Sequence, residues 1–138
     1  MRVGHNSKID LIKRVPLFSS ASKSELAEIA SIADEIDLPE GKTLIVEGDS
    51  GREFFVLVEG SAEVVRGGRN VAALGPGDFF GEIALIAKTP RNATITTTSP
   101  VRALVITDRA FRQLVDHSPQ IAVTVLVALA ERLAPTTL

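Results

Sequence analysis

The chain of 138 residues contains no cysteine and only two histidines, His5 and His117. Without cysteine it can form neither a disulfide framework nor a cysteine-ligated metal site, and this composition is compatible with the cytosol. A metalloenzyme needs clustered histidine and carboxylate ligands, and these two histidines lie far apart in the sequence. No activated nucleophile is visible either. We therefore expect a protein that is not an enzyme and needs no cofactor.

Long hydrophobic runs and an excess of one charge are also missing. The most apolar run, residues 121–130, is about half the length that crosses a bilayer. The N-terminus MRVGHNSKIDLIK has no apolar core, so no signal peptide is expected. The formal net charge of −2 predicts no strong attraction to nucleic acid or anionic lipid. The expected location is the cytoplasm, or the cytoplasmic side of a membrane protein if the chain is part of one.

What the sequence does have is enough apolar material for one core. Hydrophobic residues make up 45% of the chain, which favours a packed globule over a disordered segment. A chain of this length typically forms one domain. We therefore expect a single domain over residues 1–138.

The pattern along the chain predicts helices at both ends and strands between them. Two N-terminal helices are expected within residues 8–34, the second with a capping box of Ser22 and Glu25. From residue 35 to 106, short β-rich runs are separated by glycine and proline. About eight strands in this space favour an antiparallel, jelly-roll-like β-roll in a mainly β protein with flanking helices. Two C-terminal helices follow within residues 107–134.

The stretch FFGEIALIAKTPRNAT, residues 79–94, combines unusual residues at close spacing. Gly81 permits a close backbone approach, and the apolar residues 83–87 are long enough for about two turns of helix. Glu82 can accept hydrogen bonds from hydroxyls, and the guanidinium of Arg91 can donate two hydrogen bonds to phosphate oxygens. A phosphate donor and a sugar acceptor together predict a nucleotide site. The alternative is that Glu82 and Arg91 form a salt bridge that closes a surface turn.

This stretch resembles the phosphate-binding cassette of cyclic nucleotide-binding domains, F-G-E-[IL]-A-L-[IL]-x-x-x-P-R-x-A-[TS]. The order of elements, a β-roll followed by two helices, is also similar to that family over nearly the whole chain. The matching positions are Phe80, Gly81, Glu82, Ile83, Ala84, Leu85, Ile86, Pro90, Arg91, Ala93 and Thr94.

The resemblance implies roles for individual residues. Glu82 would bind the ribose 2′-hydroxyl and Arg91 the cyclic phosphate, with backbone N–H groups of Gly81, Ala84 and Asn92 completing the phosphate site. Ile83 and Ala93 belong to the same cassette. Asn92 departs from the alanine, serine or threonine often found there. Threonine at that position is associated with better cGMP binding, so the ligand is expected to be cAMP, with cGMP as the alternative.

The resemblance implies less directly which residues would contact the base and which would close over it. The base would lie against Val64, Val71 and Ala73, which are equally compatible with ordinary core positions. In the family the last helix closes over the base, often with an aromatic or arginine side chain. No aromatic residue follows Phe111, which leaves Arg132 as the candidate. The alternative is that Arg132 is a solvated charge at the helix end.

The expected function is a sensor that binds a cyclic nucleotide and moves its C-terminal helix. Its partner would be an unknown effector protein or a covalently linked domain, with a possible homo-oligomer through the C-terminal helix. Two alternatives remain: a cGMP sensor, or a degenerate fold that acts only in protein interaction. Direct regulation of DNA would need a helix-turn-helix after Leu133, for which the sequence to Leu138 offers no room.

Overall fold

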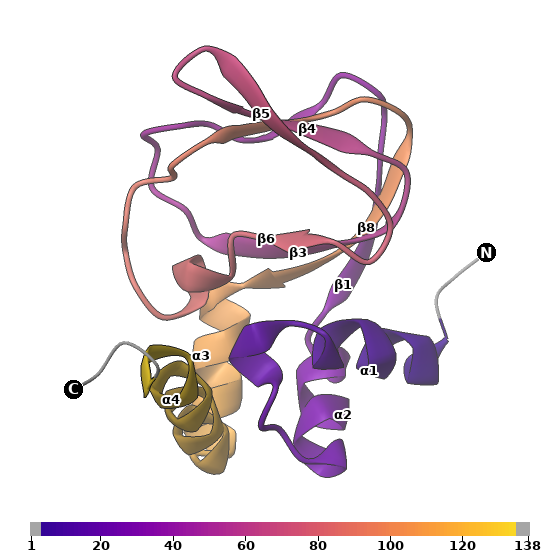
Figure 1. Cartoon of the computed structure of the whole chain (residues 1–138). Helices are drawn as coiled ribbons and strands as arrows, with labels where there is room; N and C mark the ends of the chain where they lie inside the picture. Colours follow the sequence, from indigo (N-terminus) through magenta and orange to yellow (C-terminus); the bar gives the residue numbers. More distant parts are fainter. Residues whose placement is uncertain (1–3, 135–138) are drawn as a thin grey trace. The chain divides into compact units, whose positions relative to one another are not determined.

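The computed structural model describes residues 4–134, which form two compact units (Figure 1). Residues 34–108 make up a β unit. Residues up to Ala33 and those from Arg109 onward make up a helical unit. The predicted single domain over residues 1–138 includes chain ends that lie outside the described residues.

The β unit contains two four-stranded sheets, in which all pairs of neighbouring strands are antiparallel. One sheet has the order β1-β8-β3-β6 and the other β2-β7-β4-β5. The predicted eight-stranded roll is thus confirmed. The strands are β1 (Asp34–Leu38), β2 (Thr43–Ile45), β3 (Glu53–Glu59), β4 (Ala62–Arg66), β5 (Arg69–Leu74), β6 (Phe79–Phe80), β7 (Thr94–Thr97) and β8 (Val101–Thr107).

The two sheets face each other as separate layers (Figure 1) and enclose the core of the roll. Side chains that alternate along each strand point into this space. Both layers contribute to one buried cluster, made of Ile45, Phe55, Leu57, Ala62, Ile95, Val101 and Ala103. Strands β3 and β8 supply four of these seven residues.

The helical unit combines the two ends of the chain. Its elements are α1 (His5–Lys13), η1 (Pro16–Phe18), α2 (Lys23–Ser31), α3 (Asp108–His117) and α4 (Gln120–Leu133). The predicted capping box is confirmed: the Glu25 N–H donates to Ser22 Oγ, and the Ser22 N–H donates to the Glu25 carboxylate. Phe18 and Phe111 pack with their ring centroids 6.0 Å apart, which ties η1 to α3.

Two details of the helices differ from the sequence prediction. Helix α1 begins at His5, three residues earlier than predicted. The two-turn helix predicted for residues 83–87 is a single 3₁₀ turn, η2 (Glu82–Leu85). Only Leu85 of this turn is buried, whereas Ile83 and Ile86 are 40% and 41% exposed. One anchored residue does not hold a longer helix, and residue 89 is pushed away from helical geometry by Pro90.

Helix α4 has two different faces, although its sequence is apolar nearly all round. Ile121, Thr124, Val125 and Ala128 are buried, at the spacing of one helical face. Leu126 on the opposite face is 65% exposed. The buried polar residue is satisfied, because Thr124 Oγ1 donates to Glu25 Oε2 over 2.7 Å. This bond joins α4 to α2 within the helical unit.

Among the described residues, no helix has the length and apolarity to cross a membrane. The same residues contain no cluster of three or more histidine, cysteine or acidic side chains placed to hold a metal ion.

We expect Thr124→Val to destabilise the helical unit by about 1 kcal/mol, since Glu25 loses a donor. Hydrogen bonds from the Ser22 backbone N–H and from Thr124 lower the pKa of Glu25. A lowered carboxyl pKa contributes stability above pH 4.5, and this contribution disappears as the pH falls through the lowered pKa. The difference in melting temperature between wild type and Thr124→Val should therefore shrink in acid. Thr124→Ser, which keeps the hydroxyl, is the control, and a difference that does not depend on pH would contradict the assignment.

Candidate functional site

Pairing of β6 with β3 sets the position of the cassette. Phe80 pairs with Phe55 and stacks on its ring, with centroids 5.1 Å apart. The chain then turns at Gly81, whose φ of +82° lies in the left-handed region. A Cβ at Gly81 would lie 2.7 Å from the Glu53 carbonyl oxygen. Position 81 therefore requires glycine for two independent reasons, conformation and space.

Arg91 is held by backbone and side chain at once. Its N–H donates to the Asp49 carbonyl, and its own carbonyl accepts from the Gly48 N–H, both over 2.8 Å. Its guanidinium Nη2 donates to the Glu53 carbonyl over 2.7 Å. The residues that precede and begin β3 thus fix a cation that lies about forty positions further along the chain.

The guanidinium carries its charge in a partly desolvated place. Burial lowers the pKa of Arg91, and the negative charge of Glu53 acts in the opposite direction. An arginine nevertheless stays protonated at any pH at which the protein is folded. A partly buried cation attracts an anion more strongly than a solvated one because water screens it less.

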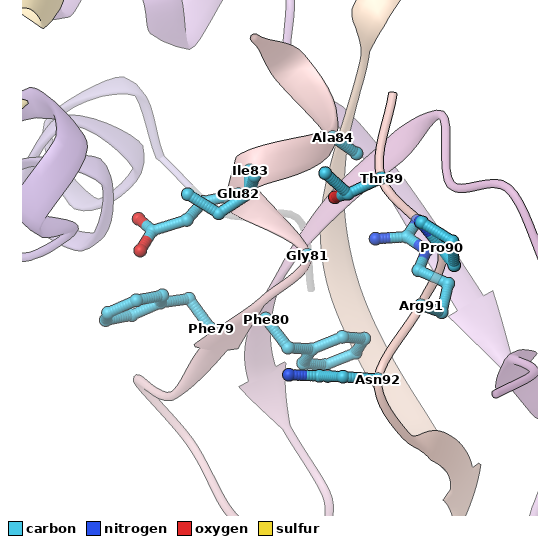
Figure 2. A pocket seen from close by; sticks show the side chains of 10 residues that line it. All are labelled: Phe79, Phe80, Gly81, Glu82, Ile83, Ala84, Thr89, Pro90, Arg91 and Asn92. Atoms are coloured by element: carbon cyan, nitrogen blue, oxygen red, sulfur yellow. The ribbon is translucent and has the colours of Figure 1, made fainter. Parts of the chain in front are cut away.

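The predicted alternative of a salt bridge between Glu82 and Arg91 is not what the structure shows. Figure 2 shows the Glu82 carboxylate and the Arg91 guanidinium on opposite sides of the Gly81 backbone, with the Glu82 side chain directed away from Arg91. The guanidinium bonds to a backbone carbonyl instead. One carboxylate oxygen of Glu82 is buried. The side chain of Glu82 would have to turn to share a ligand with Arg91.

Two adjoining pockets meet at Arg91. The first, of about 310 Å³, is formed wholly by the cassette and is drawn in Figure 2. The second, of about 170 Å³, opens between strands and is lined largely by apolar side chains. Their linings share Phe80, Gly81, Arg91 and Asn92. A ligand with an anionic end and a flat apolar end could place one in each pocket.

The structure brings most of the predicted site residues together. Gly81, Glu82, Ile83, Ala84, Arg91 and Asn92 line the first pocket. Val64 and Ala93 line the second. Val71 lies on β5, is 50% exposed and lines neither pocket. Arg132 is an exposed residue of α4 in the helical unit, so its predicted role stays a prediction.

Backbone groups near the pockets already have partners. The Ala84 N–H, predicted to face a phosphate, donates to the Gly81 carbonyl over 3.1 Å within η2. The Asn92 carbonyl accepts from Arg66 Nε over 2.9 Å. The Arg91 side chain is a fixed donor that lines both pockets.

Several lining residues were not singled out from the sequence. Phe80 matched the family pattern, but nothing indicated that it lines both pockets. Ile45, Arg66, Leu74 and Ile95 also line the second pocket. Their spacing carries no local signal, since β2, β4, β5 and β7 meet here only through sheet pairing.

The arrangement of these residues suits ligand binding more than catalysis. Arginine is the side chain best suited to holding a phosphate oxygen pair, and the apolar second pocket suits a planar ring.

The chain belongs to the cyclic nucleotide-binding domain family, whose model matches residues 35–118. This confirms the resemblance drawn from the cassette. The match covers the whole β-roll except Asp34 and extends through α3.

The relatives that contain a region similar to this chain are proteins of different kinds. The chain is 34% identical over 109 residues to a cAMP-dependent protein kinase regulatory subunit of Schizosaccharomyces pombe, covering 78% of this chain and 26% of that protein. It is 38% identical over 112 residues to a cyclic nucleotide-gated potassium channel of Mesorhizobium japonicum, covering 81% of this chain and 31% of that one. The chain thus spans less than a third of either relative.

A solved structure is similar over a larger share of both chains. It is the N-terminal domain of a transcriptional regulator from Streptomyces coelicolor, with a TM-score of 0.83 and 32% identity. The match covers 93% of this chain and 95% of that domain.

Proposed function

We propose that the protein is a regulatory domain that binds a cyclic nucleotide, with cAMP as its ligand. The observation that carries the proposal is the Arg91 guanidinium, fixed by the Glu53 carbonyl where two pockets meet. The cyclic phosphate would bind Arg91 from the first pocket. The base would enter the second, beside Val64 and Ala93. No step of this function requires a cofactor or a chemical reaction.

Glu82 would bind the ribose of the ligand. Its carboxylate can accept a hydrogen bond from the ribose 2′-hydroxyl once its side chain turns towards Arg91. The two ends of the ligand would then be recognised by different residues, Arg91 for charge and Glu82 for the hydroxyl.

The preference for cAMP rests on two observations. Position 92 is asparagine, so no threonine or serine hydroxyl is placed there for the amino group of guanine. The similar kinase regulatory subunit of Schizosaccharomyces pombe is named as cAMP-dependent. Cyclic GMP should bind no better than cAMP.

Truncation of Arg91 tests this function. Removing one partner of a buried charge pair typically costs about 2–5 kcal/mol, so Arg91→Ala should weaken cAMP binding on the order of 30-fold or more. The measurement is calorimetric titration of both proteins with cAMP and cGMP, with circular dichroism to confirm that the roll remains folded. Absence of binding by wild type to either nucleotide, or an unchanged affinity in Arg91→Ala, would refute the proposal.

Helix α4 would transmit binding to an effector. Val123, Leu126 and Val127 are 48%, 65% and 43% exposed, although apolar helix faces are normally covered. Such a face can be covered by a ligand, a second copy or a linked domain. A ligand that prefers one position of α4 would shift the population towards it.

Amide hydrogen exchange tests this transmission. Exchange in residues 122–133 should slow on adding cAMP, and by more than in β3, whose bonds already lie within the sheet. The Arg91→Ala protein at the same cAMP concentration is the control for non-specific effects. Equal protection of α4 with and without ligand would show that it is a plain structural helix.

A further inference from the structure

Gly51 lies outside the cassette, in the connection between β2 and β3, and is buried. The residues just before it pair with the cassette. Gly48 and Asp49 exchange backbone hydrogen bonds with Arg91, and Ser50 forms an isolated bridge with Pro90. The backbone of this connection is therefore fixed relative to the backbone of Arg91.

The Arg91 side chain lies directly against Gly51. It extends from a backbone bonded to Asp49 to a terminal Nη2 bonded to Glu53, and so passes over the residue between them. A Cβ at Gly51 would overlap Nε and Cζ of Arg91 and come within 2.8 Å of its Cδ. These three atoms, all of one side chain, are the nearest that the added Cβ would meet.

The reason for glycine at position 51 differs from the reason at position 81. The φ of Gly51 lies outside the left-handed region, so alanine could adopt this backbone. The three nearest atoms that an added Cβ would meet all belong to the Arg91 side chain. At Gly81, by contrast, φ is +82° and the Glu53 carbonyl also blocks a Cβ, so substitution there would strain the fold itself.

We propose that Gly51 is a positioning residue for Arg91. Because Gly51 has no side chain, the guanidinium can lie directly against its backbone, at the junction of the two pockets. This inference rests on the proposed function, because it assigns Gly51 a role in binding the cyclic phosphate. Gly51 itself contacts Arg91 and lines neither pocket. Any side chain at position 51 would lift the guanidinium away from the Glu53 carbonyl.

The test compares Gly51→Ala and Gly51→Val with wild type by titration with cAMP. We expect affinity to fall on the order of tenfold for alanine and further for valine, tenfold corresponding to about 1.4 kcal/mol. Melting temperatures should stay near that of wild type, since the displaced group is the end of a flexible side chain. Gly75→Ala is the matched control: Gly75 also lies in the β unit outside the left-handed region, and an added Cβ would meet nothing within 4 Å.

A double-mutant cycle separates positioning from a general effect on the loop. In the Arg91→Ala background, where the guanidinium is gone, adding Gly51→Ala should cause no further loss of affinity. Wild-type affinity in Gly51→Ala and Gly51→Val, or the same loss in both backgrounds, would overturn the role of Gly51 while leaving the binding function intact. If wild type bound neither cAMP nor cGMP, the proposed function would fail and this inference with it.

Discussion

The site depends on one interaction, the hydrogen bond from the Arg91 guanidinium to the Glu53 carbonyl. A free arginine side chain loses much rotamer entropy when it binds an anion, so a guanidinium fixed in advance binds more tightly. The fixation needs the turn at Gly81, the open space at Gly51 and the backbone pairing at Asp49. The Glu53 carbonyl itself belongs to β3, a strand that contributes to the core and pairs with β6 beside Gly81. The roll therefore acts as the rigid support of a single cation.

Much of the fold could be predicted from the sequence because its signals are local. Glycine and proline separate the strands at regular intervals, and the capping pair Ser22 and Glu25 marks the start of α2 at the predicted residue. The cassette helix was predicted too long, because an apolar pattern in the sequence does not show which of the apolar residues are buried in the fold. Ile83 and Ile86 remain partly exposed, and only Leu85 is anchored. Helix α4 also looked uniformly apolar, although only one of its faces is buried.

The site could be predicted in part, because some of its residues lie close together in the sequence. Gly81, Glu82 and Arg91 lie within eleven residues, and their chemistry can be read together. Gly51, the Glu53 carbonyl and Arg66 could not be identified, because the fold and not sequence spacing brings the first two to Arg91 and the third to Asn92. The absence of a side chain at Gly51 and a backbone carbonyl at Glu53 leave no distinctive residue type in the sequence. The direction of the Glu82 side chain, away from Arg91, is likewise a property of the folded chain (Figure 2).

The central claim is that charge and sugar are recognised by different side chains of one pocket. The most direct measurement is a calorimetric comparison of cAMP with its 2′-deoxy analogue on wild type, Glu82→Ala and Arg91→Ala. The account predicts that Glu82→Ala weakens cAMP but hardly changes the deoxy analogue, which has no 2′-hydroxyl for the carboxylate to accept, whereas Arg91→Ala weakens both ligands equally. Equal weakening of both ligands by Glu82→Ala would contradict it, because Glu82 would then hold the loop and not the sugar.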